Sequence, residues 1–520
     1  MKLSDLLIDI DVLETRGELP LSVSALANDS REVTTDSCFI CIEGYRVDGH
    51  DYLDQALQKG ACVAVVTRFV DVDIAQIRVA DSRFAMAAMA HRYYQMPSQK
   101  LFLVGITATN GKTSTTFMID QIYKAAAFKR AIIGTVKTEF EGFSDPSVLT
   151  TPESLTLQRF FSEMVAHAVS YCTMEVSSSG LELERVAMAD FDVVALNNIS
   201  HEHIDQHGSF EAYLKHKKKL ILGAKPTAWA ILNLDDAVSK SLIAETPAKV
   251  LTYGYADKSG DLAVTQLDLS SGKARMTVRL NRPVKTEFGT VAPTDYQIVL
   301  NVAGFHSVMN SLVAVAVAIV SGVDKATIER GLADYNGVER RFQIVYDKDF
   351  KIVDDHFANA GNIDVTFKTL SLMARQKIVF CYAIRGNRGV TTNRENAERI
   401  AHWAKRLDIG HVYATLSKNH VIWKDEVSAA EIAVFKEVLD AAGVSYSIDD
   451  DLTKAVETAV GVAEQGDIVL LAGCQGMDCG AHIALNKLYR DNFAKMDWQA
   501  HYRAIKDRVC CQGEKICERL

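Results

Sequence analysis

The stretch Gly105-Ile106-Thr107-Ala108-Thr109-Asn110-Gly111-Lys112-Thr113-Ser114 decides how this chain is interpreted. It follows the apolar run Leu101–Val104 and precedes a helical pattern with Met118, Ile119 and Ile122 on one face. A strand, a turn rich in glycine and threonine, and a Lys-Thr pair at the start of a helix are typical of a cradle for nucleotide phosphates. The stretch therefore predicts a nucleotide site at the edge of a parallel sheet.

The Lys-Thr pair carries the chemistry of this turn. Backbone N–H groups and the helix dipole would attract the phosphates, Lys112 would reach the terminal phosphates, and Thr113 would ligate magnesium. The spacing differs from the common P-loop, because five residues rather than four separate Gly105 from Gly111. The alternative is a helix that merely begins after a polar turn, which does not account for a Lys-Thr pair at this position.

Length and composition predict a soluble globular protein of two or three domains. The 520 residues exceed one core, and 48% of them are hydrophobic and 24% charged. The net charge of −9 argues against nucleic-acid and membrane partners. The chain has no apolar run near the ~18 residues of a membrane span, and its acidic start argues against a signal peptide. We expect a cytoplasmic monomer.

The ten cysteines show no metal pattern. Cys38 and Cys41 have CxxC spacing, but they lie in one apolar run without a second pair at zinc spacing, so a buried strand is the better interpretation. Reduced thiols are expected. Cys510, Cys511 and Cys517 stand in a polar tail that indicates no chemistry.

The order of predicted elements indicates the α/β class with three domains. Residues 1–97 contain short strands at Ser37–Ile42 and Cys62–Thr67 and a helix at Tyr52–Lys59. In residues 98–336, helices alternate with strands at Leu101–Ile106, Tyr171–Val176, Asp192–Leu196 and Ala228–Leu232, the signature of a parallel sheet. Val250–Val302 alternates apolar and polar residues, which predicts an antiparallel insertion. In residues 337–520, strands at Lys351–Val353, Ile378–Ala383, His411–Leu416 and Asp467–Ala472 predict a Rossmann-like, doubly wound unit.

Acidic and histidine residues follow two further strands of the central part. Glu175 ends one strand, where a carboxylate could hold magnesium or its water, although a solvated strand end is the alternative. Residues 197–208 place three histidines and two acids in one loop, which indicates metal or phosphate chemistry rather than structural zinc, since no cysteine accompanies them. The basic run 215–219 is ordinarily a solvated helix face, but its place after this loop favours a functional lysine.

Together these segments resemble the Mur ligases, the ATP-dependent amide ligases of peptidoglycan precursor synthesis, and among them those that add the third residue of the stem peptide. Gly105–Ser114 is similar to their ATP loop, with Ala108 where a glycine is usual. Residues 174–181 resemble Glu-Val-Ser-Ser-His-Gly-Leu, with Ser179 for the histidine. Residues 198–208 resemble Asn-Leu-Ser-x-Asp-His-Leu-Asp-x-His-Gly, with Glu202 for the first aspartate. The resemblance covers nearly the whole chain.

The resemblance also implies site residues for each domain. ATP would be bound by Thr109, Asn110, Gly111, Lys112, Thr113, Ser114, Asn310, Arg341 and Asp354. Mg²⁺ would be held by Thr113, Glu175, His203 and Lys217, with Lys217 carbamylated to N6-carboxylysine. The UDP-linked substrate would meet Ser30, Tyr45, Arg46, Thr150, Thr151, Ser177 and Arg185. Residues 1–97 would bind the UDP moiety, 98–336 the ATP, and 337–520 would close over ATP and bring the amine.

The last domain departs most from the family's pattern. Gly386-Asn387-Arg388 resembles its Gly-Asp-Arg element, but Ser417–His420 stands where Asp-Asn-Pro-Arg marks the use of diaminopimelate. Residues 473–478 replace Gly-Lys-Gly-His-Glu. Arg388, Asn419 and Asp478 are the candidate amine-binding residues. Because the distal carboxylate of meso-diaminopimelate calls for a bidentate arginine, we expect a different amine.

The resemblance implies an ADP-forming ligase that activates a carboxylate as an acyl phosphate and adds an amino acid to UDP-N-acetylmuramyl-dipeptide. One alternative keeps the ATP chemistry but serves a specialised natural-product pathway with another acceptor and amine. A second is an inactive regulatory protein that binds nucleotide. The retained Lys112, Thr113, Glu175, His203 and Lys217 argue against this second alternative.

Overall fold

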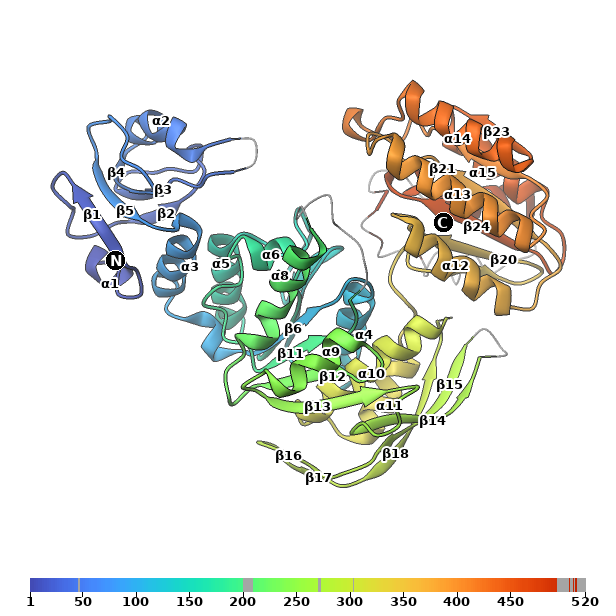
Figure 1. The fold of residues 1–520 in the computed structure, drawn as a ribbon, viewed down its shortest axis with the longest axis horizontal. Coiled ribbons are helices and arrows are strands. Elements are labelled where there is room, and N and C mark those ends of the chain that lie inside the picture. The colour runs from blue at the N-terminus through green and yellow to red at the C-terminus, as the bar shows by residue number, and fades with distance from the viewer. Residues whose placement is uncertain are drawn as a thin grey trace. The chain divides into compact units, whose positions relative to one another are not determined.

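The computed structural model describes residues 1–44, 47–199, 209–269, 273–302 and 304–492, together with Ile505, Arg508, Cys510 and Cys511. The chain forms two compact units (Figure 1). Unit 1 comprises Met1–Ala263, Arg279–Thr294 and Asn310–Gly331, and unit 2 comprises Val264–Val278, Asp295–Met309 and Leu332–Leu520. None of the helices in the described part of the chain has the length and hydrophobicity needed to span a bilayer.

Unit 1 begins with a small mixed sheet in the order β1-β5-β4-β3-β2. Its strands are β1 (Val12–Arg16), β2 (Ala25–Ala27), β3 (Ser37–Ile40), β4 (Ala61–Val66) and β5 (Ala75–Val79), and its helices are α1 (Leu3–Leu6), α2 (Leu53–Gln58) and α3 (Ser82–Tyr93). β2 to β5 pair in parallel and β1 pairs antiparallel with β5. Cys38 and Cys41 are buried, as expected for a core strand rather than a metal site.

The large sheet has the order β18-β15-β14-β13-β12-β11-β6-β10-β7-β8-β9. Its strands are β6 (Phe102–Thr107), β7 (Arg130–Ile133), β8 (Lys137–Phe140), β9 (Phe143–Pro146), β10 (Tyr171–Glu175), β11 (Val193–Leu196), β12 (Trp229–Asn233), β13 (Lys249–Gly254), β14 (Leu262–Asp268), β15 (Ala274–Leu280) and β18 (Thr294–Leu300). The accompanying helices are α4 (Lys112–Ala125), α5 (Ser154–Ala166), α6 (Ser178–Glu182), α8 (Phe210–Leu222), α9 (Ala237–Ser241), α10 (Phe305–Val320) and α11 (Lys325–Ala333), and β16 (Val284–Thr286) pairs with β17 (Gly289–Val291).

The parallel register of the central strands positions the site. β6 lies between β10 and β11, and Glu175 pairs with Ile106 while Leu196 pairs with Thr107. The carboxyl ends of these three strands therefore meet at one edge of the sheet. This edge is where ligands bind in open α/β sheets.

The prediction of a separate antiparallel insertion at Val250–Val302 is wrong in its first part. β13 pairs in parallel with both β12 and β14, so it is a strand of the central sheet. The alternation on which the prediction rested is present in β18, where Tyr296, Ile298 and Leu300 are buried and the residues between them are more exposed. Exposure of one face produces a period of two whether the neighbouring strand is parallel or antiparallel.

Unit 2 contains a doubly wound sheet in the order β19-β20-β24-β21-β22-β23. Its strands are β19 (Gln343–Asp347), β20 (Lys351–Asp355), β21 (Ile378–Ala383), β22 (Val412–Thr415), β23 (Tyr446–Asp449) and β24 (Ile468–Gly473), and its helices are α12 (Ala360–Leu372), α13 (Val390–Arg406), α14 (Ala429–Ala442), α15 (Leu452–Gly461) and α16 (Gly480–Asn492). Only the edge strand β19 pairs antiparallel among these ladders.

Two cores cover the two faces of this sheet. Phe380 packs with α12, α13 and α14, whereas its neighbour Val379 packs with α15 and α16. Successive residues of β21 point to opposite faces of the sheet, and both faces are buried. The strand Ile378–Ala383 is therefore apolar along its whole length. The predicted α/β class is therefore confirmed, while the boundaries at 97/98 and 336/337 stay predictions.

The C-terminal tail docks on unit 2 in a way that the sequence did not indicate. Ile505 is buried in the core beside α15 and α16, and Arg508 forms an ion pair with the fully buried Asp354 at 2.7 Å. Cys479 and Cys511 form a disulfide across 32 residues. The expectation of reduced thiols is therefore wrong for this pair, because the fold brings two distant cysteines together where the sequence shows only a polar tail.

The Arg508 ion pair is expected to stabilise the edge of the sheet around β20. Replacement of Arg508 by alanine leaves the buried Asp354 without one of its partners and should lower the local unfolding free energy of β20 by about 3 kcal/mol. Amide exchange in β20 should therefore become roughly hundred-fold faster. Hydrogen-exchange mass spectrometry of the full chain measures this change. The control is Arg490→Ala, because Arg490 is half-exposed and its pair with Glu457 should contribute at most about 1 kcal/mol. Equal exchange in the two variants would contradict the assigned role.

Candidate functional site

The predicted phosphate loop connects β6 to α4 and depends on one glycine. Gly111 caps α4 with φ +91°, a left-handed conformation that L side chains rarely adopt. A Cβ at this position would also overlap the side-chain oxygen of Asn310. The backbone can therefore turn into the helix and approach Asn310 only without a side chain at residue 111.

Asn310 lies in a buried polar chain next to the loop. Its side-chain oxygen accepts a hydrogen bond from Asn197 Nδ2 at 2.7 Å, and Tyr253 donates to Asn197 Oδ1 at 2.6 Å. Asn310 Nδ2 is buried and has no acceptor among the residues that the structure describes. An unsatisfied buried donor costs about 1–3 kcal/mol, which an acceptor atom of a nucleotide would offset. The buried donor of Asn310 beside the phosphate loop therefore fits a bound nucleotide.

Polar contacts fix the loop to the segment after β11. Thr109 N–H donates to the Asn198 carbonyl at 2.9 Å, and Asn110 N–H donates to the Asn198 side chain at 3.0 Å. The Lys112 ammonium folds over the loop and donates to the carbonyls of Ala108 and Thr109 at 2.9 and 3.1 Å. Ser114 follows in the first turn of α4. The loop thus places the N-terminus of α4 and one lysine at the carboxyl edge of the sheet, where the helix dipole favours an anion.

Glu175 is the centre of the site. Its side chain is fully buried, so the alternative of a solvated strand end is wrong. Thr113 Oγ1 donates to Glu175 Oε2 at 2.9 Å, while the Thr135 N–H and hydroxyl donate to the two carboxylate oxygens at 2.7 and 3.0 Å. Gly134 is required beside it, because a Cβ there would overlap Glu175 Oε1. Hydroxyl and carboxylate oxygens are hard donors, so this set fits Mg²⁺.

Lys217 extends from α8 into the same buried region. Its ammonium is almost fully buried and donates to Thr107 Oγ1 at 3.0 Å and to the Ala108 carbonyl at 2.7 Å. Burial and the charge of Lys112 lower the pKa of Lys217 well below its usual value, although Glu175 opposes this shift. An uncharged amine of this kind is the form that reacts with carbon dioxide.

The other lysines of the basic run differ from Lys217. Lys218 and Lys219 reach the surface and pair with Glu245 and Glu184 at 3.9 and 2.7 Å. The structure therefore distinguishes the buried Lys217 from its solvated neighbours, which the sequence of the basic run alone could not do. His203 and the rest of residues 200–208 lie outside the described residues.

The predicted acceptor residues cluster around the backbone of Glu175. Thr151 Oγ1 donates to the Glu175 carbonyl at 3.0 Å and accepts from the Ser177 N–H at 3.0 Å. Thr150 contacts Thr135 at 3.1 Å between their hydroxyl oxygens. Arg185 donates to the Thr151 carbonyl at 3.3 Å. Hydrogen bonds therefore connect Thr113 of the nucleotide loop with the predicted acceptor loop through a single glutamate.

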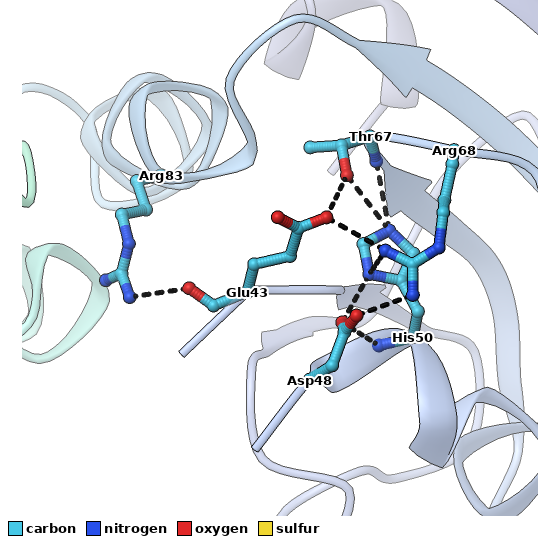
Figure 2. A network of polar contacts seen from close by, with 6 residues as sticks. All are labelled: Glu43, Asp48, His50, Thr67, Arg68 and Arg83. Atoms are coloured by element: carbon cyan, nitrogen blue, oxygen red, sulfur yellow. Dashed lines mark hydrogen bonds and ion pairs between the residues drawn. The ribbon is translucent and has the colours of Figure 1, made fainter. Parts of the chain in front are cut away.

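The predicted UDP loop of the small sheet is held by a separate network (Figure 2). His50 Nδ1 bonds Asp48 at 2.6 Å and His50 Nε2 accepts from the Thr67 N–H at 3.1 Å, while Arg68 bonds both Glu43 and Asp48. Burial raises the pKa of Asp48, but hydrogen bonds from the His50 backbone and Arg68 prevail and lower it to about 2.

This network resembles a metal site in composition only. Glu43, Asp48 and His50 could together offer three ligands, but the guanidinium of Arg68 already supplies the positive charge between the two carboxylates. The predicted Tyr45 and Arg46 lie outside the described residues. Ser30 lies apart from the network and donates to the Gln55 side chain.

In unit 2 the predicted ATP-binding residue Asp354 lies in a buried ion-pair cluster. Asp354 faces Arg340 at 3.5 Å and Arg508 at 2.7 Å, while the ATP-binding role of Arg341 stays a prediction. Arg340 also pairs with Asp478. Burial lowers the pKa of Arg340, but Asp354 and Asp478 prevail and raise it, so the arginine stays charged. The sequence pattern Arg340-Arg341 could not distinguish the two, because only the fold determines which side chain enters the core.

The candidate amine residues lie on neighbouring loops of unit 2. Arg388 donates to Asp425 at 3.2 Å, and Asn419 is exposed in the turn after β22. Lys418 pairs with Asp450 at 2.7 Å. Asp478 is committed to Arg340. Two of the charged residues within the altered segments thus already have oppositely charged partners in the protein.

Comparisons with known proteins agree over nearly the whole chain. Residues 22–108 match the catalytic domain of the Mur ligase family, 106–318 the Mur ligase middle domain, and 340–475 the Mur ligase glutamate ligase domain. The UDP-N-acetylmuramoyl-L-alanyl-D-glutamate–2,6-diaminopimelate ligase of Geobacillus thermodenitrificans is 35% identical and aligns over 88% of this chain and 91% of its own. The ligase of the same name from Alkaliphilus metalliredigens is 32% identical, over 95% and 96% of the two chains.

Solved structures support the same fold. A structure of a ligase with the same name has a TM-score of 0.61 at 22% identity and covers 86% of this chain and 89% of its own. The MurF ligase of Thermotoga maritima in complex with ADP has a TM-score of 0.60 at 19% identity, over 90% and 97% of the two chains. The three-domain α/β fold expected from the sequence is confirmed, and the chain belongs to the Mur ligase family.

Proposed function

We propose that this chain is an ATP-dependent, ADP-forming ligase that adds an amino acid to UDP-N-acetylmuramyl-dipeptide. The observation that carries the proposal is the buried connection from Thr113 through Glu175 to Thr151 and Ser177. It links the nucleotide loop to the predicted acceptor loop, as transfer of a phosphoryl group between them requires. The names of the relatives, which describe ligases acting on a muramoyl dipeptide, support the choice of acceptor.

Amide formation from a carboxylate needs activation of the acid. In the proposed reaction, a carboxylate oxygen of the acceptor attacks the terminal phosphorus of ATP and ADP leaves. The amine nitrogen then attacks the acyl carbon, the phosphate leaves, and the amine loses a proton. The protein has little covalent work here, so its residues act by position and charge. Lys112 would balance the charge of the phosphates, and the N-terminus of α4 would attract them through the helix dipole.

We assign Mg²⁺ to the oxygen donors around Glu175. Thr113, Glu175 and a carbamylated Lys217 would hold the ion, with His203 as a predicted further contact. When bound, the ion would offset the repulsion between the phosphate and the acceptor carboxylate. A lysine ammonium would repel the ion, whereas a carbamate offers hard oxygens. The burial of Lys217 between Thr107 and Ala108 supports this assignment.

A specialised-pathway ligase is the second candidate, and the amine end of unit 2 favours it. Lys418 and Asp478, which lie within the two altered segments, already have partners in Asp450 and Arg340. They are therefore poorly placed to recognise a second zwitterionic centre. This candidate keeps the ATP chemistry and changes the acceptor and the amine.

Lys112→Ala is expected to lower ADP formation by about 10²- to 10³-fold with the fold intact, because it removes the cation of the phosphate loop. Amine-dependent ADP release measures the effect, and circular dichroism measures the fold. Lys124→Ala, an exposed change at the other end of α4, is the control and should retain full activity. Near wild-type turnover by folded Lys112→Ala protein would rule out this ATP site.

Lys217→Ala is expected to be at least about 10²-fold less active and to recover activity with acetate, which can replace the carbamate oxygens. NMR with ¹³C-bicarbonate should show a carbamate signal in the wild type that this variant lacks. Lys219→Ala, on the same helix but paired with Glu184 at the surface, should behave like the wild type. A carbamate signal that persists in Lys217→Ala would refute the assignment.

The amine is expected to be a compound other than meso-diaminopimelate. ADP release with UDP-N-acetylmuramyl-dipeptide, each of the twenty amino acids and meso-diaminopimelate at equal concentration tests the choice. A preferred kcat/KM for meso-diaminopimelate by a wide margin would contradict the expectation. Activity only with another acceptor acid would favour the specialised pathway. Nucleotide binding without ADP release for any pair would favour the regulatory alternative.

A further inference from the structure

Two neighbouring loops of unit 2 carry two of the three candidate amine residues, Arg388 and Asn419. One loop, residues 384–389, leaves β21, and the other, residues 416–428, leaves β22. The two strands pair in parallel, with Ala383 opposite Thr415, so both loops start at the same edge. α13 and α14, which follow the loops, also pack on one another (Figure 1).

One buried carboxylate joins these loops. Glu431 is the third residue of α14 and its side chain is buried. Its Oε1 accepts hydrogen bonds from the Arg388 and Gly389 N–H groups at 2.9 and 2.8 Å, and its Oε2 accepts one from the Asn387 N–H at 3.2 Å. These donors are more than forty residues away in sequence.

Glu431 also caps its own helix. Its Oε2 accepts from the Ser428 N–H and hydroxyl at 2.9 Å each, which forms a capping box. Burial raises the pKa of Glu431, but hydrogen bonds from the Ser428 and Arg388 backbones prevail and lower it, so the group stays an anion. If Glu431 served only to cap α14, its contacts with Ser428 would be sufficient. The hydrogen bonds from the N–H groups of residues 387–389 therefore indicate a second role.

The loop that Glu431 holds is strained and tightly packed. Asn387 has φ +54°, a conformation that costs about 1 kcal/mol or more and persists only where the surroundings enforce it. Gly386 packs against the backbone of Asp425, and a Cβ there would overlap the Asp425 carbonyl oxygen. The Asp425 carboxylate in turn accepts from the Arg388 guanidinium at 3.2 Å.

These contacts fix Arg388 at both ends. Glu431 holds its backbone and Asp425 holds its guanidinium, whose side chain remains 36% exposed. Among the described residues, two of its nitrogens donate, to Asp425 and to the Asn387 carbonyl. An arginine has five N–H donors, so donors remain for a carboxylate. A fixed orientation of the guanidinium matters, because a bidentate contact between an arginine and a carboxylate requires the two planar groups to be aligned.

We propose that Glu431 is a positioning residue that holds Arg388 in place to bind the carboxylate of the incoming amino acid. The proposal rests on the ligase function proposed above. Glu431 does not touch the amine in this arrangement and acts through the backbone of residues 387–389. Loss of its charge therefore weakens amine binding and leaves the ATP chemistry intact.

Steady-state kinetics with the full chain test this role. Glu431→Gln is expected to raise the KM for the amino acid by about 10- to 100-fold, with kcat and the KM for ATP within about threefold of the wild type. Ser428→Ala is the matched control, because it removes the cap and leaves the contacts with residues 387–389. It should lower stability and leave the KM for the amino acid within about twofold. Equal KM values in Glu431→Gln and the wild type would overturn the proposal.

A double-mutant cycle separates positioning from a general structural effect. If Glu431 acts through Arg388, the Glu431→Gln/Arg388→Ala protein should bind the amino acid no more weakly than Arg388→Ala alone. Independent, multiplying effects would show that Glu431 acts elsewhere. Should Glu431→Gln not fold, Glu431→Asp keeps the charge with a shorter reach and should give an intermediate KM.

A readout without turnover distinguishes failure of this inference from failure of the proposed function. Hydrogen exchange of the amides of residues 387–389 should quicken at least tenfold in Glu431→Gln and stay unchanged in Ser428→Ala. If the wild type releases no ADP with any amine, the ligase function fails while this exchange result still decides the positioning. Unchanged exchange in Glu431→Gln would overturn it.

Discussion

The buried carboxylate of Glu175 is the interaction on which the rest of the site depends. A carboxylate buried in a protein needs hydrogen bonds to its oxygens, because a buried polar group without partners is costly. Thr113 and Thr135 provide those bonds, and Thr151 binds the backbone carbonyl of the same residue. The bonds to the side chain fix the nucleotide loop relative to the turn after β7, and the bond to the carbonyl fixes the segment around Thr151 to the same strand.

The need to satisfy buried polar groups also explains two residues next to the phosphate loop. Lys217 and Asn310 are buried polar residues; Lys217 donates to the loop carbonyl of Ala108, and Asn310 accepts a hydrogen bond from Asn197. Asn310 leaves no room for a Cβ at Gly111, and the buried carbonyl of Ala108 accepts the hydrogen bond from Lys217. Catalytic loops commonly retain such costly groups because function, rather than stability, requires them.

The sequence predicted the nucleotide loop and the parallel strands because their signals are local. Residues 105–114 combine strand, turn and helix start in one segment, and β6, β10 and β11 are short segments that are rich in buried residues. By contrast, Arg508, Cys511 and Glu431 act on partners far along the chain, and no local pattern marks such pairs. The capping box from Ser428 to Glu431 is a local contact, but a pattern of this kind marks only the start of a helix and not the distant loop that Glu431 also bonds.

The charged residues near the candidate amine site of unit 2 differ in whether they have partners within the protein. Each of Lys418, Arg340 and Asp478 has an oppositely charged partner, so these groups offer little net charge to a ligand. Arg388 differs, because its side chain is held from both ends and keeps donors in reserve. Under the proposed function, a site built in this way would bind one carboxylate next to the reacting amine through Arg388. Residues 417–420 hold no arginine that could bind a second carboxylate in the same way, so the retained Arg388 and the altered motif would act on the same choice of amine.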